Sequence, residues 1–432
     1  MGPQTLACWI GAGLSTFESA REAAREAARE AGPSRGARGR AEVDLAFLFL
    51  SPAHLEEAEA AVEAVREELA PRHLLGCVAE GVVAGVRELE QGPAVAVWAG
   101  VLPGAEIECF HVAAVQTDDG IAVAGAPELE DDPALVTVLV DPFTFPTGLF
   151  LASLNERHER LPLVGGIAVG GGKPGEQALI LDEAVHAEGA VGAVVSGLPV
   201  LTVVSQGCRP IGREAVVTRC DGNVVYELAG MPALERLRSE IAALSSEERA
   251  LAAQGLLAGL EIDENRPEYD TGDFLMRGLI GADQATGALA LADTVRVGQT
   301  LRFFVRDAAS ADADLRQALA GTLGRARPAG ALLFTCNGRG TNMFPQPDHD
   351  ARVVTETLGT QALAGFFLRR RDRPSRRQGL PARVHGHPGR LPRALRPKRR
   401  KARPRDPARA RQPLPRACSQ RGLPVLRKRE GA

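Results

Sequence analysis

The chain has 432 residues and a formal net charge of −3 at pH 7, but its charges are divided unevenly. Residues 368–432 hold 23 of the 51 Lys and Arg and 3 of the 54 Asp and Glu, which leaves 28 basic and 51 acidic residues in the rest. An acidic body repels phosphate backbones and anionic lipid, so we expect neither a nucleic-acid nor a membrane partner.

The seven cysteines are scattered, odd in number and free of any C-x-x-C pair. This pattern argues against a disulfide framework or a structural zinc and favours a reducing compartment. Residues 1–16 lack the charged start and apolar run of a signal peptide. The best apolar run, 189–204, is interrupted by Gly197 and Pro199 and is too short to span a bilayer. We therefore expect a cytoplasmic protein.

The first predicted element is a helix over residues 18–31, with Ser15 and Glu18 at the spacing of a capping box. Its Ala-Arg-Glu-Ala repeat places three arginines on one face. A Glu follows every Arg, so this face is expected to be solvated rather than to bind nucleic acid. Residues 32–40 are rich in Gly, Pro, Ser and Arg and are predicted to be a linker.

A weak repeat then organises the body, and each copy consists of a strand, a helix, a strand that enters a glycine, and a further strand. The first copy is predicted at 43–50, 53–69, 74–77 and 94–101, the second at 135–140, 147–157, 163–166 and 190–196, and the third begins at 331–335, 350–358 and 363–366. Between the last two copies we expect helices at 232–244, 245–260 and 311–323 and strands at 201–204 and 297–305. This alternation predicts an α/β (α+β) fold of layered mixed sheets covered by helices.

The most informative segment follows the strand at 331–335, because its polar groups gather where an apolar strand ends. Arg339 offers a planar guanidinium that pairs bidentately with a carboxylate, and Asn337 offers an amide that both donates and accepts. These groups suit an amino-acid ligand, although a turn held by two glycines with Arg339 in water explains them as well. Gln206 and Arg209 form a second candidate wall, for which a structural turn is an equal alternative.

Catalytic and metal chemistry are weaker interpretations of the same segment. Cys336 with His349 as its base has the elements of a thiol nucleophile, but a small apolar residue ending a buried strand is the simpler reading. Asp348, His349 and Asp350 are three adjacent residues without a second ligand cluster, and an aspartate that caps the next helix explains them better. We expect no catalytic residue, no metal and no cofactor.

The body resembles the FIST family, which is named for F-box and intracellular signal transduction and has an N-terminal and a C-terminal FIST domain. The motifs that carry this resemblance are Val43-Asp44-Leu45, Leu75-Gly76-Cys77, Asp141-Pro142-Phe143, Val164-Gly165-Gly166, Val204 to Gly212, Phe274 to Arg277, Gly298-Gln299, Val305-Arg306-Asp307 and Cys336 to Gly340. The resemblance implies a sensory module for small molecules such as amino acids, with a signalling protein as a further partner. Vertebrate relatives that carry an F-box suggest a protein-interaction adaptor as the alternative.

The basic tail departs from the family after Phe367, where the resemblance implies Cys-Ala-Gly-Glu-Ile-Gly-Pro, then Leu-His-Gly-Phe and a last strand. Codons for residues 368–374, read one base later, can spell the first motif, and codons for residues 380–385 can spell the second. A frameshift at this junction is therefore expected. The tail has no Phe, Tyr, Trp, Ile or Met, so we predict that it is disordered.

These observations predict four segments: a helix and linker at 1–40, an N-terminal domain at 41–228, a truncated C-terminal domain at 229–367 and the tail at 368–432. The expected function is sensing of a small ligand held between the two domains. The candidate ligand-binding residues are Cys336, Asn337, Arg339, His349, Gln206 and Arg209. A protein-interaction adaptor and a Cys336-dependent enzyme are the second and third alternatives.

Overall fold

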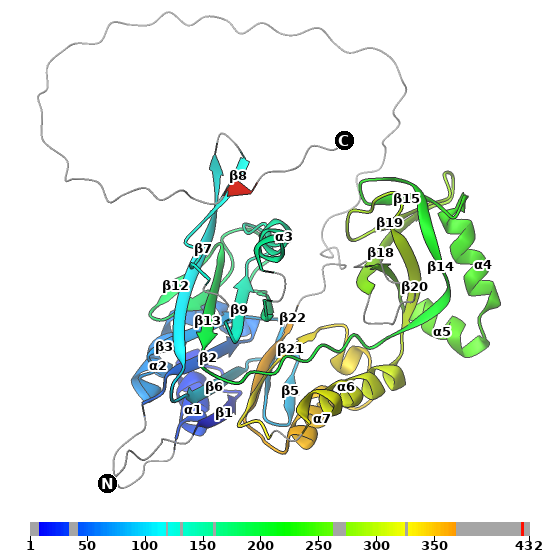
Figure 1. Ribbon diagram of the computed structural model, residues 1–432. Helices are drawn as coiled ribbons and strands as arrows, with labels where there is room; N and C mark the ends of the chain where they lie inside the picture. The colour runs from blue at the N-terminus through cyan, green and yellow to red at the C-terminus, as the bar shows by residue number, and fades with distance from the viewer. Residues whose placement is uncertain are drawn as a thin grey trace, which may run out of the picture. The chain divides into compact units, whose positions relative to one another are not determined.

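The structure is a computed structural model that describes residues 8–33, 42–117, 120–129, 133–158, 161–261, 274–324, 327–368 and 425–426. Helices and mixed sheets together make up these residues, so the predicted α+β class is confirmed (Figure 1). Four sheets are present among them.

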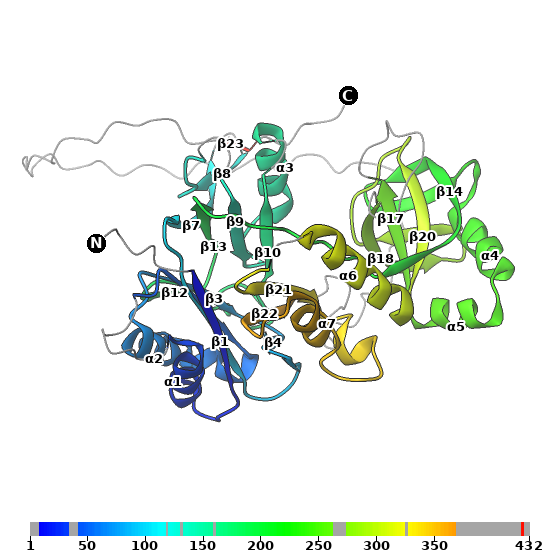
Figure 2. The same cartoon turned by 60° about the horizontal axis from the view of Figure 1, so that its bottom comes forward.

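The first sheet has the order β1-β6-β2-β3-β11-β12 and carries two helices on one face (Figure 2). Its strands are β1 (Trp9–Ser15), β2 (Leu45–Leu50), β3 (His73–Val78), β6 (Val95–Val101), β11 (Leu179–Leu181) and β12 (Ala184–His186). The helices are α1 (Ala20–Ala31) and α2 (Ala58–Leu69), with the 3₁₀ turn η1 (Pro52–Glu57) before α2. The alanines of α1 pack against β1 and β6, and its arginines pair with glutamates of α2, including Arg21 with Glu63 at 2.7 Å.

The second sheet has the order β10-β9-β13-β7-β8-β23. Its strands are β7 (Glu106–Thr117), β8 (Gly120–Ala124), β9 (Leu135–Val140), β10 (Leu163–Ile167), β13 (Ala190–Ser196) and β23 (Val425–Leu426), and helix α3 (Thr147–Arg157) connects β9 to β10. Phe150 and Leu154 of α3 pack on the buried valines of β9, so this helix covers one face of the sheet.

The third sheet has seven strands in the order β14-β20-β17-β18-β19-β15-β16. These are β14 (Cys208–Asp221), β15 (Val224–Leu228), β16 (Met231–Pro232), β17 (Leu256–Glu261), β18 (Phe274–Asp283), β19 (Ala288–Leu291) and β20 (Thr300–Arg306). Two helices, α4 (Ala233–Ala243) and α5 (Ser246–Gln254), contact its strands. All neighbouring strands in this sheet are antiparallel.

The fourth sheet joins strands that lie far apart in the sequence, in the order β21-β22-β4-β5. Its strands are β21 (Ala331–Cys336), β22 (Leu363–Leu368), β4 (Gly81–Ala84) and β5 (Arg87–Leu89). Apolar side chains of α6 (Ala308–Leu323) and α7 (His349–Leu358) cover one face. Phe334 and Phe366 on the other face belong to the same core cluster as Phe49 of the first sheet.

The three repeat copies are found where the sequence predicts them, but three local predictions are wrong. Helix α1 is capped by Ser19, whose side chain accepts from the Glu22 amide, whereas Ser15 ends β1. Helix α5 stops at Gly255, which has a φ of 158°, and β17 follows where the helix was predicted to continue. The segment 201–204 is not a strand, and β1 was not predicted.

Of the predicted disordered tail, Leu368 ends β22, and Val425–Leu426 pairs with β8 as β23. The rest of that prediction lies outside the described residues. None of the described helices combines the length and apolarity needed to cross a membrane.

Candidate functional site

The segment that follows β21 lies at one end of the fourth sheet, where three strand ends meet. β21 and β22 are parallel, so Cys336 and Leu368 end at the same side of the sheet. β22 is antiparallel to β4, which brings Gly81 opposite Phe367 and places the start of β4 at this side. Loops from residues about 250 apart in the sequence are thereby brought together.

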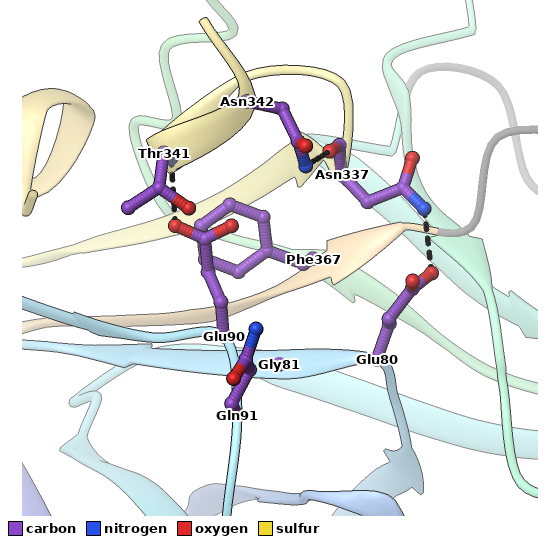
Figure 3. Close-up of a pocket in the computed structure, with 8 residues that line it drawn as sticks. All are labelled: Glu80, Gly81, Glu90, Gln91, Asn337, Thr341, Asn342 and Phe367. Carbon is purple, nitrogen blue, oxygen red and sulfur yellow. Dashed lines mark hydrogen bonds between the residues drawn. The ribbon is translucent and has the colours of Figure 1, made fainter. Parts of the chain in front are cut away.

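A pocket of about 180 Å³ lies at this end of the sheet (Figure 3). It is lined by Glu80, Gly81, Glu90, Gln91, Asn337, Thr341, Asn342 and Phe367. The ring of Phe367 is the one large apolar surface among these residues, and polar groups surround it (Figure 3). The pocket therefore suits a small polar ligand better than an apolar one.

Two carboxylates give the pocket its charge, and no Lys or Arg lines it. Glu80 accepts a hydrogen bond of 2.6 Å from the Asn337 side chain, and Glu90 accepts one of 2.8 Å from the Thr341 amide. The Asn342 amide group donates to the Asn337 carbonyl at 2.7 Å, which holds the loop in place. This arrangement attracts a cationic group and repels an anionic one.

Gly340 allows Glu90 to reach the loop. Its φ of 53° lies in the left-handed region that favours glycine. A Cβ at this position would lie 2.6 Å from a carboxylate oxygen of Glu90. Both conformation and space therefore require glycine here.

Arg339 lies beside the pocket in a buried ion pair rather than in the pocket wall. Its Nε and Nη2 donate to the two carboxylate oxygens of Asp350 at 2.6 and 2.8 Å, and the two residues are 8% and 2% exposed. Asp350 also accepts from the Thr335 hydroxyl at 3.0 Å. Burial acts to raise the pKa of Asp350, but the hydrogen bonds and charge of Arg339 outweigh it and the pKa is lowered.

The remaining nitrogen of Arg339, Nη1, is buried and has no hydrogen-bond acceptor among the described residues. A Cβ built on Gly207 would lie 2.4 Å from this atom, so the guanidinium fits against the glycine that precedes β14. The structure therefore connects two predicted segments, Cys336 to Gly340 and Gln206 to Arg209, through this close approach.

His349 has a carboxylate partner on each ring nitrogen. Nδ1 lies 2.9 Å from Asp350 and Nε2 lies 2.9 Å from Asp312, and the ring stacks on Phe344 with centroids 3.5 Å apart. The Cys336 sulfur accepts from the Gly338 amide at 3.4 Å. The hydrogen bonds of His349 orient it toward the aspartates, which disfavours it as a base for Cys336.

The second predicted wall is turned toward other partners. The Gln206 side chain donates to the Phe274 carbonyl at 3.0 Å, and Arg209 pairs with Glu248 at 2.8 Å. Neither residue lines the pocket. Of the six candidate ligand-binding residues, Asn337 is the one that does.

Sequence reasoning missed Glu80, which precedes β4, and Glu90, which follows β5, because neither short strand carries a motif. Arg306 at the end of β20 belongs to the quoted Val305-Arg306-Asp307 motif but was not named as a candidate site residue. A Cβ on Gly338 would lie 1.9 Å from the Arg306 Nη1 atom, so this guanidinium lies against the loop, and its buried Nε has no hydrogen-bond partner among the described residues. The signal available for Arg306 was its position at a strand end beside Asp307.

The described cysteines are all free, and among the described residues no cluster of His, Cys, Asp or Glu has the geometry to hold a metal ion. Burial raises the pKa of Cys109 to about 12. No unusually reactive thiolate is indicated at this partly buried position.

Comparison with known proteins identifies both halves of the chain. The FIST N domain matches residues 44–231, and the FIST C domain matches residues 233–368. An uncharacterized protein of Mycobacterium tuberculosis is 43% identical over 325 residues, which cover 75% of this chain and 84% of the relative. An uncharacterized protein of Mycobacterium bovis is 42% identical over 360 residues, which cover 83% and 92%. This chain therefore belongs to the FIST family.

Proposed function

We propose that this chain is a non-catalytic sensory protein that binds a small amine-bearing molecule of amino-acid size in the pocket at the end of β21. FIST domains are associated with signal transduction and sensing. The observation that carries the proposal is a pocket lined by two carboxylates, amide groups and one aromatic ring, and by no basic residue. The six free cysteines that the structure describes support a cytoplasmic setting.

Size and charge together limit the ligand. At about 180 Å³ the pocket is smaller than the roughly 300–1,000 Å³ of sites for drug-sized ligands, which favours a small molecule. An ammonium group can pair with Glu90 or Glu80 and displace water from the carboxylates. A purely anionic ligand meets like charge there, so a zwitterionic amino acid is favoured for its ammonium end.

The test is a thermal-shift and calorimetric series on the full chain with three compounds for each side chain: the amino acid, its decarboxylated amine and its deaminated acid. We expect the first two to stabilise the protein and the third to have no effect. Equal stabilisation by the amino acid and by its deaminated acid would refute recognition of the ammonium group.

Glu90→Gln keeps an oxygen acceptor for the Thr341 amide while it removes the charge. We expect it to weaken binding about tenfold or more, because charge-assisted hydrogen bonds contribute about 1.5–3 kcal/mol. Glu106→Gln, at an exposed position at the start of β7, is the matched control and should bind as the wild type does.

An adaptor function is the second candidate, because the connector between β13 and β14 exposes apolar side chains. Leu201 is 52% and Val204 is 79% exposed, and Val200 and Val203 are each 36% exposed. Replacing Leu201 and Val204 with Ser should leave ligand binding unchanged in a sensor. Loss of a cellular partner without loss of ligand binding would favour the adaptor.

We also propose that the chain shifts frame at Phe367/Leu368. The FIST C match ends at residue 368, where the composition changes to an Arg- and Pro-rich sequence. Sequencing the gene across this junction tests the proposal. The same Arg-rich reading, found intact in the genes of close relatives, would contradict it.

A further inference from the structure

Two repeat copies share one strand topology. In the first copy, β2 is parallel to β3 on one side and antiparallel to β6 on the other. In the second copy, β9 is parallel to β10 on one side and antiparallel to β13 on the other. The returning strand starts at the same place in both, with Val95 opposite Leu50 and Ala190 opposite Val140.

The third copy has the first two strands of this arrangement and not the returning one. β21 is parallel to β22 through α7, as β2 is to β3 through α2. Within the described residues, no strand pairs with the other edge of β21. This edge is the position that β6 and β13 occupy in the complete copies.

The backbone of β21 is arranged to accept such a strand. The amides of Ala331 and Asn337 donate to β22, at Ala362 and Leu368. Hydrogen bonding alternates along a strand, so the amides of Leu332, Phe334 and Cys336 face the other edge.

The side chains of β21 are also more exposed than those of the equivalent strands β2 and β9, as expected if a neighbouring strand is missing. All six residues of β2 and five of the six residues of β9 are buried, whereas Thr335 alone is buried in β21. The half-exposed residues of β21 include Leu332, Leu333 and Phe334. Charged side chains, Lys above all, and Pro usually protect an edge strand from pairing with another chain. The sequence of β21 contains neither a charged residue nor Pro.

We propose that the open edge of β21 binds an extended segment of a second polypeptide as an antiparallel strand. The strands that fill the equivalent edges indicate the chemistry of this segment. β6 and β13 each have seven residues, carry no charge and are rich in Val, Ala and Gly. By the shared register, the first residue of the bound strand lies opposite Cys336, at the end of β21 that adjoins the ligand pocket.

The probe is a fluorescent peptide with the sequence of residues 190–196, flanked by Gly-Lys at both ends, titrated into the full chain. Binding should raise the anisotropy of the peptide and slow hydrogen exchange at the amides of Leu332, Phe334 and Cys336. Exchange at Leu333 and Thr335, which already face β22, should stay the same. Exchange that is already slow at the three outward amides of the free chain would show an occupied edge and overturn the proposal.

N-methylated peptides test the edge without any change to the protein. An antiparallel strand at an open edge bonds through alternate amides on one side. Methylation of those amides should weaken binding about tenfold or more, and methylation of the intervening amides should change it less than about threefold. Equal losses in both series would exclude strand pairing.

A protein variant gives the complementary test. Leu332→Pro removes an outward amide, and Leu332→Ala removes the same side chain and keeps the amide. We expect the proline variant to bind the peptide about tenfold more weakly than the alanine variant, provided that both melt cooperatively. Equal affinities contradict the proposal, and if the proline variant does not fold, the methylated peptides decide.

The molar mass of the free chain, measured by light scattering, distinguishes binding of a partner's strand at the β21 edge from pairing with a second copy of this chain. We expect the free chain to be monomeric, with the outward amides exchanging fast. A dimer that protects Leu332 and Phe334 without peptide would assign the edge to self-association and overturn the proposal.

Discussion

Arg339 and Asp350 form a buried ion pair beside the pocket, in which two of the three guanidinium nitrogens have a partner. A bidentate guanidinium–carboxylate pair also fixes the direction of the loop between β21 and α7. Nη1 is the one guanidinium nitrogen of Arg339 left without a partner among the described residues, because Nε and Nη2 both donate to Asp350. Arg339 therefore serves mainly to hold the loop between β21 and α7, because its charge is already paired with Asp350.

Asp350→Asn should destabilise the protein, because it leaves the buried Arg339 without a counter-charge. Breaking one partner of a buried pair costs about 3–5 kcal/mol in the free energy of unfolding. Urea denaturation at pH 7 measures this change. Asp348→Asn, which alters a more exposed carboxylate of the same helix end, should cost far less; similar losses for both variants would show that the burial of the pair does not matter.

Glu88 is a second buried carboxyl, and it caps helix α7 from β5. Its Oε1 accepts from the Ala351 amide at 2.8 Å, whereas Asp348 at the N-cap position has a φ of 65° and accepts from the Glu88 amide. Asp348 stands at the predicted N-cap position, but its side chain makes no capping hydrogen bond to α7, and Glu88 supplies one instead. Burial, aided by neighbouring carboxylates, raises the pKa of Glu88 from 4.5 to about 7.

The stability of the fold should fall as pH rises through the titration of Glu88. Folded Glu88 retains its proton up to about pH 7 and the unfolded residue only to about pH 4.5, so folding is favoured below this window and the advantage is lost across it. Glu88→Gln should raise the free energy of unfolding at pH 8 by up to about 3 kcal/mol and change it little at pH 4.5. Urea titrations at both pH values measure this, and equal effects at the two would contradict it.

The sequence predicted the loop of the site but not its chemistry. Asn337 and Arg339 stand out because they follow an apolar strand between glycines. Glu80 and Glu90 carry no such signal, and they reach the pocket because β22 pairs with β4, whose paired residues lie 280 to 286 positions away in the sequence. No local pattern encodes a contact at that sequence separation.

Among the elements, helix α1 shows how small residues set a packing distance. All six of its buried residues are alanines, and Gly11 and Gly13 of β1 lie beneath them. A Cβ on Gly13 would lie 2.1 Å from the Ala27 carbonyl oxygen. Glycine under alanine therefore lets the helix approach the strand closely.

Gly13→Ala should destabilise the protein by about 1–3 kcal/mol, because the helix has to move away from the sheet. Gly148→Ala in α3 is the matched control, since a Cβ there would have no atom within 4 Å. This control should be neutral or should stabilise the helix by about 0.5–1 kcal/mol. Thermal unfolding of both variants measures the difference, and effects of the same sign would contradict the close-packing argument.

Element type was predictable where one period dominates the sequence. The bounds of α3, β9 and β13 agree with prediction to the residue, because each is a clear apolar or amphipathic run. The predicted helix through residue 260 was wrong, because Gly255 ends α5 and the apolar run after it is β17. A short apolar run fits a helix or a strand equally well until its partner strands are known.

Over the whole molecule, the two complete copies indicate what a frame-restored chain would gain. A chain read one base later from Leu368 should place the missing third strand of this copy on β21 and bury Leu332 and Phe334. We expect its melting temperature to rise and its affinity for the strand peptide to disappear. Unchanged melting and retained peptide binding would show that the restored segment does not fill this edge.

Strand β22 pairs with β21 from the FIST C match on one side and with β4 from the FIST N match on the other. The peptide link before β14, which lies within the FIST N match, is therefore not the only connection between the parts of the chain on its two sides. A protease that cuts the exposed connector at Leu201 should leave two fragments that still migrate as one species until denatured. The parts of the chain before and after Leu201 should therefore associate without a covalent link. Split or circularly permuted versions of the chain should remain assembled.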